Sequence, residues 1–125
     1  LVERELGRGS MALTHFFGRP QNILMACKGD QIENYLVPSV RGEQMDALAM
    51  TEPDAGSDVR GMKCFAKRDG TDWIVNGTKH FISGAEHADF VIVFIATGEE
   101  KTEKGPKKKI TAFLVDRIEE RKASQ

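Results

Sequence analysis

The chain has 125 residues and a formal net charge of −1, with 40% hydrophobic and 30% charged residues, which is typical of one globular domain and excludes a second large one. The near-neutral charge excludes a global field that would attract nucleic acid or anionic lipid. The longest apolar run, residues 90–96, is far shorter than the ~20 residues of a membrane-spanning helix, so we expect no nucleic-acid partner and no membrane span.

The start of the chain and its two cysteines indicate its cellular context. The chain begins with Leu1 rather than Met and has no hydrophobic stretch after a basic start, so we expect an internal fragment without a signal peptide. Cys27 and Cys64 lie far apart and lack CxxC spacing, which favours free, buried thiols in a reducing compartment over a disulfide.

Residues 1–45 carry apolar side chains at helical spacing, interrupted by Gly and Pro, which predicts short helices. Asp30 is a good N-cap, because its carboxylate can accept a free amide of the first turn while Glu33 reaches back in a D-x-x-E capping box. Pro38 should end the helix that starts there, since its ring clashes with the preceding turn and it lacks an N–H, and a short new turn could begin at this proline.

The second part of the chain has the pattern of strands. Over residues 62–67 we expect every second side chain to share one face, and Asp69-Gly70 supplies a turn. Residues 73–75 and 79–82 flank Asn76-Gly77, the dipeptide that best tolerates the positive φ angles of a type I′ turn. This arrangement predicts a β-hairpin centred on Asn76-Gly77.

Two more strands are predicted over residues 90–96 and 110–115, because both are apolar runs of strand length. The charged stretch 98–109 between them contains Gly and Pro and predicts a loop, in which Lys107, Lys108 and Lys109 form a solvated charge run rather than a phosphate site. The polar tail, residues 118–125, should fray.

Two short segments have the composition of a binding site. In the first, residues 48–58, a short strand leads into a turn where Gly56 and Ser57 can direct amides and a hydroxyl at a phosphate-bearing ligand; the alternative is a surface turn with side-chain capping. In the second, a predicted strand puts Phe81 and Ser83 on one face, where the ring could cover a flat heterocycle and the hydroxyl could bond its edge; the alternative is core packing.

Together, MTEPDAGSD at 50–58 and IVNGTKHFIS at 74–83 resemble, in residues and in interval, the paired signature of acyl-CoA dehydrogenases. The preceding helices resemble the end of that family's N-terminal helical domain, so the resemblance covers about residues 3–116. It implies an α+β fold in which short N-terminal helices precede an antiparallel, β-barrel-like middle domain. The sequence after residue 117 departs from the family's usual Pro-Gly turn, which leaves the completeness of the barrel open.

The domain organisation implied by the resemblance has three parts. Residues 1–45 would be the end of the helical domain, residues 46–117 part of the middle β-domain, and residues 118–125 a tail.

The resemblance also implies FAD as the cofactor. Thr51 would bond the pyrimidine side of the isoalloxazine, while Gly56 and Ser57 would lie near the pyrophosphate, and Ser57 would also contact the acyl-CoA. Phe81 stands where the family usually has a Trp against the flavin, and Ser83 where it has a Thr whose hydroxyl faces flavin N5. The full set of implied flavin contacts is Leu48, Met50, Thr51, Gly56, Ser57, Phe81, Ile82 and Ser83.

The implied reaction is α,β-dehydrogenation of an acyl-CoA thioester in fatty-acid β-oxidation, with hydride transfer to the flavin. The family's base is a Glu in a C-terminal helical domain that this chain does not include, so we assign no catalytic residue, give Glu52 no base role, and expect an isolated fragment to be inactive. The resemblance further implies an electron-transferring flavoprotein as partner, a dimer or tetramer of the full-length protein, and a cytoplasmic location in a bacterium or the mitochondrial matrix in a eukaryote.

Other functions have weaker support from the residues. A non-catalytic β-domain that associates through an open sheet edge is the main alternative to the flavoenzyme. The spacing of His15, His80 and His87 does not suit a metal site, so none is expected. The stretch Gly7-Arg8-Gly9 lacks the third glycine and the preceding strand of a nicotinamide-dinucleotide fingerprint.

Overall fold

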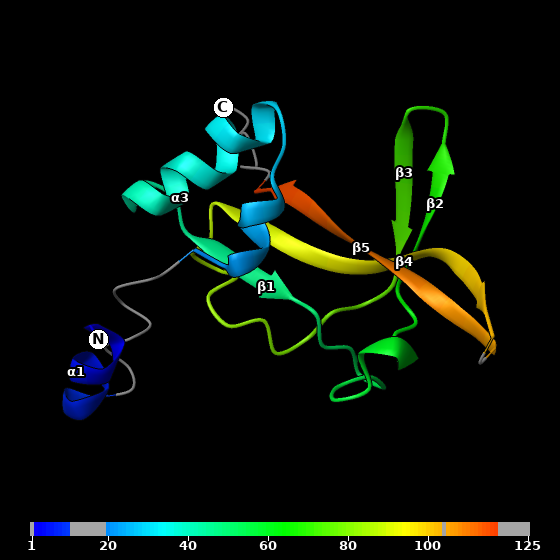
Figure 1. Ribbon diagram of the computed structural model, residues 1–125, viewed down its shortest axis with the longest axis horizontal. Coiled ribbons are helices and arrows are strands. Elements are labelled where there is room, and N and C mark those ends of the chain that lie inside the picture. The colour runs from blue at the N-terminus through cyan, green and yellow to red at the C-terminus, as the bar shows by residue number, and fades with distance from the viewer. Residues whose placement is uncertain (1, 11–19, 104, 118–125) are drawn as a thin grey trace, which may run out of the picture. The chain divides into compact units, whose positions relative to one another are not determined.

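The computed structural model describes residues 2–10, 20–103 and 105–117, and the predicted tail at 118–125 lies outside these ranges. The chain divides into two compact units, Leu1–Asp46 and Ala47–Gln125, which we describe separately. The first is helical and the second is built on a sheet, so the predicted α+β class is confirmed (Figure 1). Within the described ranges, no helix has the length and apolar character needed to cross a membrane.

The first unit consists of short helices, as predicted. Helix η1 buries Leu24, and its last turn leads to Lys28, whose N–H donates to Oε1 of Gln31 at 3.2 Å. The side chain that reaches back at the start of the next helix is thus Gln31, which bonds to Lys28, and this pair lies two residues before the predicted pair of Asp30 and Glu33. The helices are α1 (Val2–Gly9), η1 (Asn22–Ala26), η2 (Ile32–Leu36) and α3 (Val37–Arg41).

Pro38 does not end its helix, contrary to the prediction. The π-helical turn η2 runs directly into α3, and the Val37 N–H bonds to the Ile32 carbonyl, five residues back. This wider turn accommodates the proline ring. In a regular α-helix, the N–H that proline lacks would leave a gap in the backbone hydrogen bonds. The helix ends instead at Gly42, whose φ of 73° allows the Glu43 N–H to bond to the Pro38 carbonyl at 2.9 Å, as in a Schellman motif.

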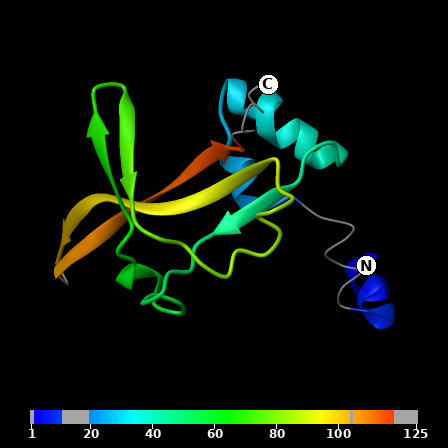
Figure 2. The ribbon, with the colours of Figure 1, turned by 180° about the vertical axis from the view of Figure 1, so that it is seen from behind.

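The second unit is an open sheet of five strands in the order β1-β4-β2-β3, with β5 paired to the other side of β4. Strands β4 and β5 pair antiparallel, as do β2 and β3, but β2 pairs parallel to β4 through Phe65 and Ala96. The sheet is therefore mixed, whereas the prediction was an antiparallel one. Both ribbon views show the β2–β3 hairpin standing away from β4 and β5 (Figure 2). The strands are β1 (Asp46–Ala49), β2 (Phe65–Asp69), β3 (Asp72–Asn76), β4 (Phe90–Thr102) and β5 (Gly105–Asp116); a short helix, η3 (Val59–Gly61), precedes β2.

The predicted hairpin at Asn76-Gly77 is wrong, whereas the predicted Asp69-Gly70 turn is confirmed. Strand β2 pairs with β3 so that Asp69 faces Asp72, and Gly70 adopts a φ of 60° in the turn between them. Gly77 instead ends β3 with a φ of 134°, and a Cβ built there would lie 2.8 Å from the Cα of Cys64. Glycine is needed at this position for a close backbone crossing rather than for a turn.

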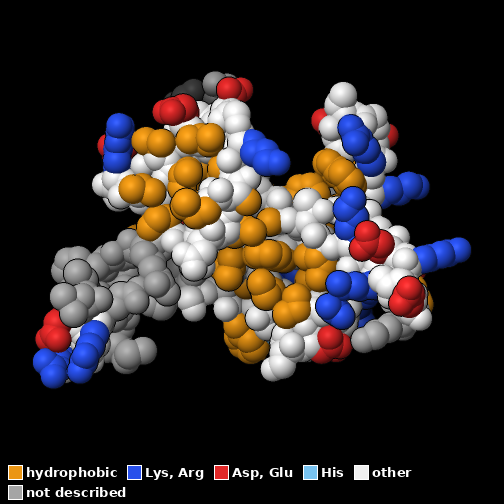
Figure 3. Space-filling model, in the orientation of Figure 1, with side chains coloured by type: hydrophobic (Ala, Val, Ile, Leu, Met, Phe, Trp, Pro, Cys, Tyr) orange, Lys and Arg blue, Asp and Glu red, His pale blue; other side chains and the backbone are white. Residues whose placement is uncertain are grey.

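Strands β4 and β5 contain the two predicted apolar runs but extend much further. The predicted loop at 98–109 is wrong, because the strands stay paired as far as Thr102 and Gly105. Glu99 lies opposite Lys108, and the next acidic residue also faces a lysine, so that opposite charges across the strands favour pairing. Acidic and basic side chains are mixed at this end of the hairpin (Figure 3).

Strand β4 supplies the core of the sheet unit, because its first half is buried from both faces. Phe90 and Ile92 are fully buried, Ala96 packs in one cluster with Met62, and Ile95 packs in another with Cys64. Buried and exposed side chains alternate over residues 62–67, as predicted, although β2 begins only at Phe65, the fourth residue of this segment. The segment between η3 and β2 is thereby packed against the central strand.

We expect Gly77→Ala to lower the free energy of unfolding by about 2 kcal/mol or more, because a methyl group there overlaps Cys64 and the φ is unfavourable for alanine. Gly70→Ala is the matched control, since it has a positive φ but open space around it, and should cost about 1 kcal/mol. Urea unfolding of the wild-type protein and of the two variants measures both costs. Equal costs would show that the close crossing imposes no constraint.

Candidate functional site

The structure brings the two sequence segments of the candidate site together. Thr51 follows β1 and His80 follows β3, and the His80 N–H donates to the Thr51 carbonyl at 3.0 Å. Glu52 and Ala55 exchange two backbone hydrogen bonds, of 2.9 and 3.2 Å, which turn the chain sharply after Thr51. The two segments therefore form one surface rather than facing opposite sides of the molecule.

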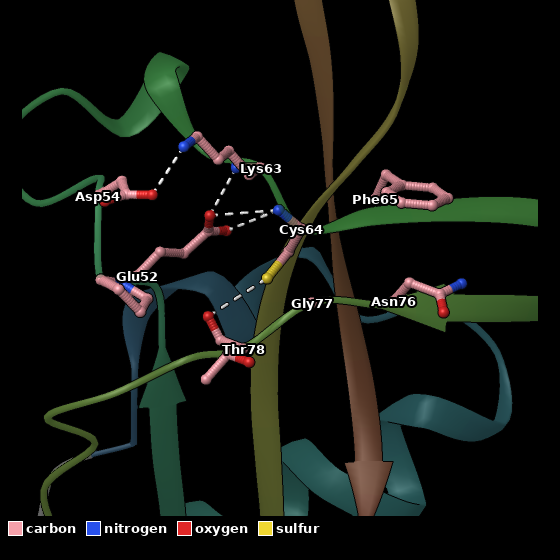
Figure 4. A pocket seen from close by; sticks show the side chains of 9 residues that line it. Glu52, Asp54, Lys63, Cys64, Phe65, Asn76, Gly77 and Thr78 are labelled. Carbon is pink, nitrogen blue, oxygen red and sulfur yellow. Dashed lines mark hydrogen bonds and ion pairs between the residues drawn. The ribbon is translucent and has the colours of Figure 1, made fainter.

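The carboxylate of Glu52 is the polar centre of this region. Its side chain is 3% exposed and accepts hydrogen bonds from the backbone N–H groups of Lys63 at 2.5 Å and Cys64 at 3.1 Å. The Lys79 ammonium donates to the same carboxylate at 2.7 Å. Figure 4 shows the carboxylate pointing toward the backbone of Lys63 and Cys64. Three separate segments are therefore held together around one anion.

The environment of Glu52 fixes its charge. Burial alone would raise the pKa of the carboxyl, but the hydrogen bonds from Lys79, Lys63 and Cys64 outweigh it and lower the pKa to about 2. A carboxylate with so low a pKa and three donors is a poor general base. Glu52 is thus unsuited to the role of a base, and it has instead a structural role that the sequence did not reveal.

The neighbouring thiol is not set up as a nucleophile. Burial, followed by the hydrogen bond and charge of Glu52, raises the pKa of Cys64, and its Sγ donates to the Thr78 carbonyl at 3.5 Å. Cys64 and the half-buried Cys27 are both free thiols. In the described part of the chain, no three His, Cys, Asp or Glu side chains lie close enough to hold a metal ion, and His15 lies outside it.

The predicted site residues differ in their burial and surroundings. Thr51 is half-buried, and within the described residues neither its hydroxyl nor its N–H takes part in a hydrogen bond. The described hydrogen bonds do not join the Gly56 turn to the segment that contains Phe81. Of the remaining predicted contacts, those half-buried are Leu48, Met50 and Ile82, and those exposed are Gly56, Ser57, Phe81 and Ser83.

Phe81 is the most unusual of these residues. The expected strand does not form: Phe81 has a left-handed φ of 57°, and Ser83 begins a turn, so the argument that they share a strand face is wrong. The Phe81 side chain is 84% exposed, which excludes the alternative of core packing, and its ring lies 4.0 Å from that of His80 between centroids. A bulky residue with positive φ is uncommon, and such strain is often found at functional sites.

A hydroxyl and an N–H such as those of Thr51 can bond the edge of a flat heterocycle, and an exposed ring such as that of Phe81 can cover its face. A separate pocket of about 210 Å³ lies over the Glu52 carboxylate and includes Cys64 and Gly77 (Figure 4). It is smaller than the roughly 300 Å³ of a typical ligand site and does not include Thr51 or Phe81. The candidate site is therefore the open surface between Thr51 and Phe81 and not this pocket.

The lowered pKa of Glu52 predicts a dependence of stability on pH. The carboxylate should stabilise the fold fully above its usual pKa of 4.5, and this contribution, about 3 kcal/mol, should disappear as the pH falls toward 2. Denaturant unfolding of the intact protein and of Glu52→Gln between these pH values measures it. The wild-type curve should fall more steeply than that of the variant, and parallel curves would contradict the assignment.

Comparisons with known proteins identify the family of the chain. The family model for the acyl-CoA dehydrogenase middle domain matches residues 47–123. A 3-(aryl)acrylate reductase of Clostridium sporogenes is 37% identical over 95% of this chain and 32% of its own length. The mitochondrial long-chain specific acyl-CoA dehydrogenase of Rattus norvegicus is 44% identical over 70% of this chain and 20% of its own length.

A solved structure, the FAD complex of PigA, superposes with a TM-score of 0.62 at 34% identity, covering 72% of this chain and 22% of its own. The chain thus spans a third or less of each of these proteins. The matched family model extends over the sheet, the Glu52 turn and the segment around Phe81, and the chain belongs to the acyl-CoA dehydrogenase family.

Proposed function

We propose that this chain forms part of the flavin site of an FAD-dependent acyl-CoA dehydrogenase. The observation that carries the proposal is the hydrogen bond from the His80 N–H to the Thr51 carbonyl, which joins the backbone next to the exposed Phe81 to Thr51, whose hydroxyl and N–H are free within the described residues. In this proposal Thr51 bonds the pyrimidine edge of the isoalloxazine and Phe81 covers its apolar surface. Ser83 supplies a hydroxyl near flavin N5.

The other assigned residues complete this surface in the proposal. Leu48, Met50 and Ile82 are half-buried and would form its apolar wall. Gly56 and Ser57 are exposed in the turn after Glu52 and would lie near the pyrophosphate, with Ser57 also contacting the acyl-CoA. FAD, when bound, would accept a hydride from the substrate. The similarity to PigA, which has been solved as an FAD complex, supports this choice of cofactor.

The reaction proposed is the α,β-dehydrogenation of an acyl-CoA thioester. The rat relative is named a dehydrogenase and the clostridial one a reductase, so membership of the family is compatible with either direction of the redox step. Glu52 is committed to its three donors, and we place the catalytic base outside the described residues. An isolated 125-residue chain is therefore proposed to be inactive.

The cellular setting is proposed from the family as well. Acyl-CoA is the substrate, an electron-transferring flavoprotein takes up the electrons, and the intact protein is a homo-oligomer acting in β-oxidation. A mitochondrial relative and a clostridial one are compatible with the matrix or the bacterial cytoplasm. We retain the division into residues 1–45, 46–117 and 118–125 as part of this proposal.

One observation favours the second candidate, a non-catalytic domain that binds a partner through a sheet edge. Among the described strands β3 pairs only with β2, and its three large apolar residues, Trp73, Ile74 and Val75, are exposed. Such an edge favours pairing with another chain or segment. An FAD titration of the intact protein, followed by its visible spectrum, separates the two functions. A yellow, stoichiometric complex is expected; a protein that stays colourless and self-associates on size exclusion would favour the second.

We expect Phe81→Ala in the intact protein to weaken FAD binding about tenfold, because the flavin would lose the apolar cover that the ring provides. Phe65→Ala is the matched control, since Phe65 is also exposed but lies on β2. Flavin fluorescence titration gives both dissociation constants. Equal effects of the two substitutions on FAD affinity would contradict the proposed contact between Phe81 and the flavin.

A further inference from the structure

Two consecutive residues hold three consecutive residues of the proposed flavin segment. The Lys79 ammonium donates to the Met50 carbonyl at 2.9 Å and to Glu52 Oε1 at 2.7 Å. Between these two contacts, the His80 N–H donates to the Thr51 carbonyl at 3.0 Å. The Met50 and Thr51 carbonyls and the Glu52 side chain are thus bonded to the two residues immediately before Phe81.

The contacts of Lys79 differ from those of an ordinary surface lysine. Its side chain is only 10% exposed, and its ammonium reaches residues that are 27 and 29 positions away in the chain. The ion pair of Lys63 with Asp54 is also short, at 2.6 Å, but both side chains are largely exposed. Exposed pairs impose little constraint, whereas a buried ammonium with two partners restricts where both segments can lie.

We propose that Lys79 is a positioning residue of the flavin site, which sets the separation between the Thr51 donors and the Phe81 ring without touching the flavin. This inference rests on the proposed function. By tying the Met50 carbonyl to the segment that leads into Phe81, Lys79 leaves the Thr51 hydroxyl and N–H free for a ligand. Preorganised contacts of this kind lower the cost of ordering a site when the ligand binds.

The competing explanation is that Lys79 only stabilises the fold by compensating the buried charge of Glu52. The two roles predict different behaviour of the protein when that charge is removed. A purely stabilising lysine becomes dispensable when Glu52 is neutral, whereas a positioning lysine does not, because the Met50 carbonyl still lacks its donor.

The experiment uses the intact protein that carries this chain, with FAD titration and visible circular dichroism of the bound flavin. Lys79→Met should weaken FAD binding about tenfold or more and change the flavin dichroism, because a charge-assisted hydrogen bond is lost on each side of Thr51. Lys108→Met is the matched control, since the Lys108 ammonium also donates to a backbone carbonyl, that of Met62 at 2.5 Å, but outside the candidate site. The control should bind FAD like wild type.

The double variant Glu52→Gln with Lys79→Met separates the two roles. Its resistance to urea should recover relative to Lys79→Met, because no unpaired charge remains buried, while its FAD affinity should stay low. If Lys79→Met does not fold, the FAD affinity of the double variant is compared with that of Lys108→Met instead. Wild-type affinity in Lys79→Met, or recovery of affinity together with stability in the double variant, would overturn the inference. A wild-type protein that fails to bind FAD would instead overturn the proposed function, and the inference with it.

Discussion

The buried carboxylate of Glu52 is the interaction on which the arrangement of the candidate site depends. Removing an ion from water costs several kcal/mol unless the protein replaces the lost hydration with well-placed donors. Here the donors come from Lys63, Cys64 and Lys79, which belong to two other segments of the chain. The buried anion loses part of this compensation when any one of them moves away, so the cost of burial becomes a constraint on the backbone.

This constraint extends from the carboxylate to the central strand. Cys64, whose N–H binds Glu52, also accepts the Ala96 N–H through its carbonyl at 3.1 Å, and that bond joins β2 to β4. The first half of β4 is buried or half-buried, and its residues Ile95 and Ala96 belong to the two core clusters of the sheet unit. The residues of the candidate site lie in loops, but the loops are fixed at strand ends. Sites supported in this way keep their geometry better than free loops do.

The sequence allowed prediction of those features that depend on local chemistry. The apolar runs of β4 and β5 have strand length, and Asp69-Gly70 is a turn wherever two strands flank it. Asn76-Gly77 has equally good turn chemistry, but the structure uses the freedom of Gly77 for a close approach to Cys64, a contact between residues distant in sequence. The pairing of Glu99 with Lys108 is likewise visible only once the register is known.

The candidate site shows the same division. The two segments that carry the predicted residues could be named from short motifs, and the bond between His80 and Thr51 brings these segments together, while the roles of the residues stay predictions. The role of Glu52 could not be predicted, because two of its donors are backbone N–H groups, which every residue other than proline has. The role of Glu52 follows from its burial beside Lys79 in the structure. A local sequence pattern does not show that a charged residue is buried.

Phe81 combines two unfavourable features that contacts within the described chain do not offset. A left-handed backbone costs a bulky residue about 1–2 kcal/mol, and an exposed phenylalanine forgoes roughly 1.5–3 kcal/mol of burial. A Phe ring has no polar donor, so only contact with another apolar surface can recover this energy. Since the backbone that leads into the ring is held by Lys79 and His80, the ring is presented in a fixed place rather than left free to fold back. The proposed flavin contact would offset both costs, because a flat ligand against the ring would bury the apolar surface that the fold leaves exposed.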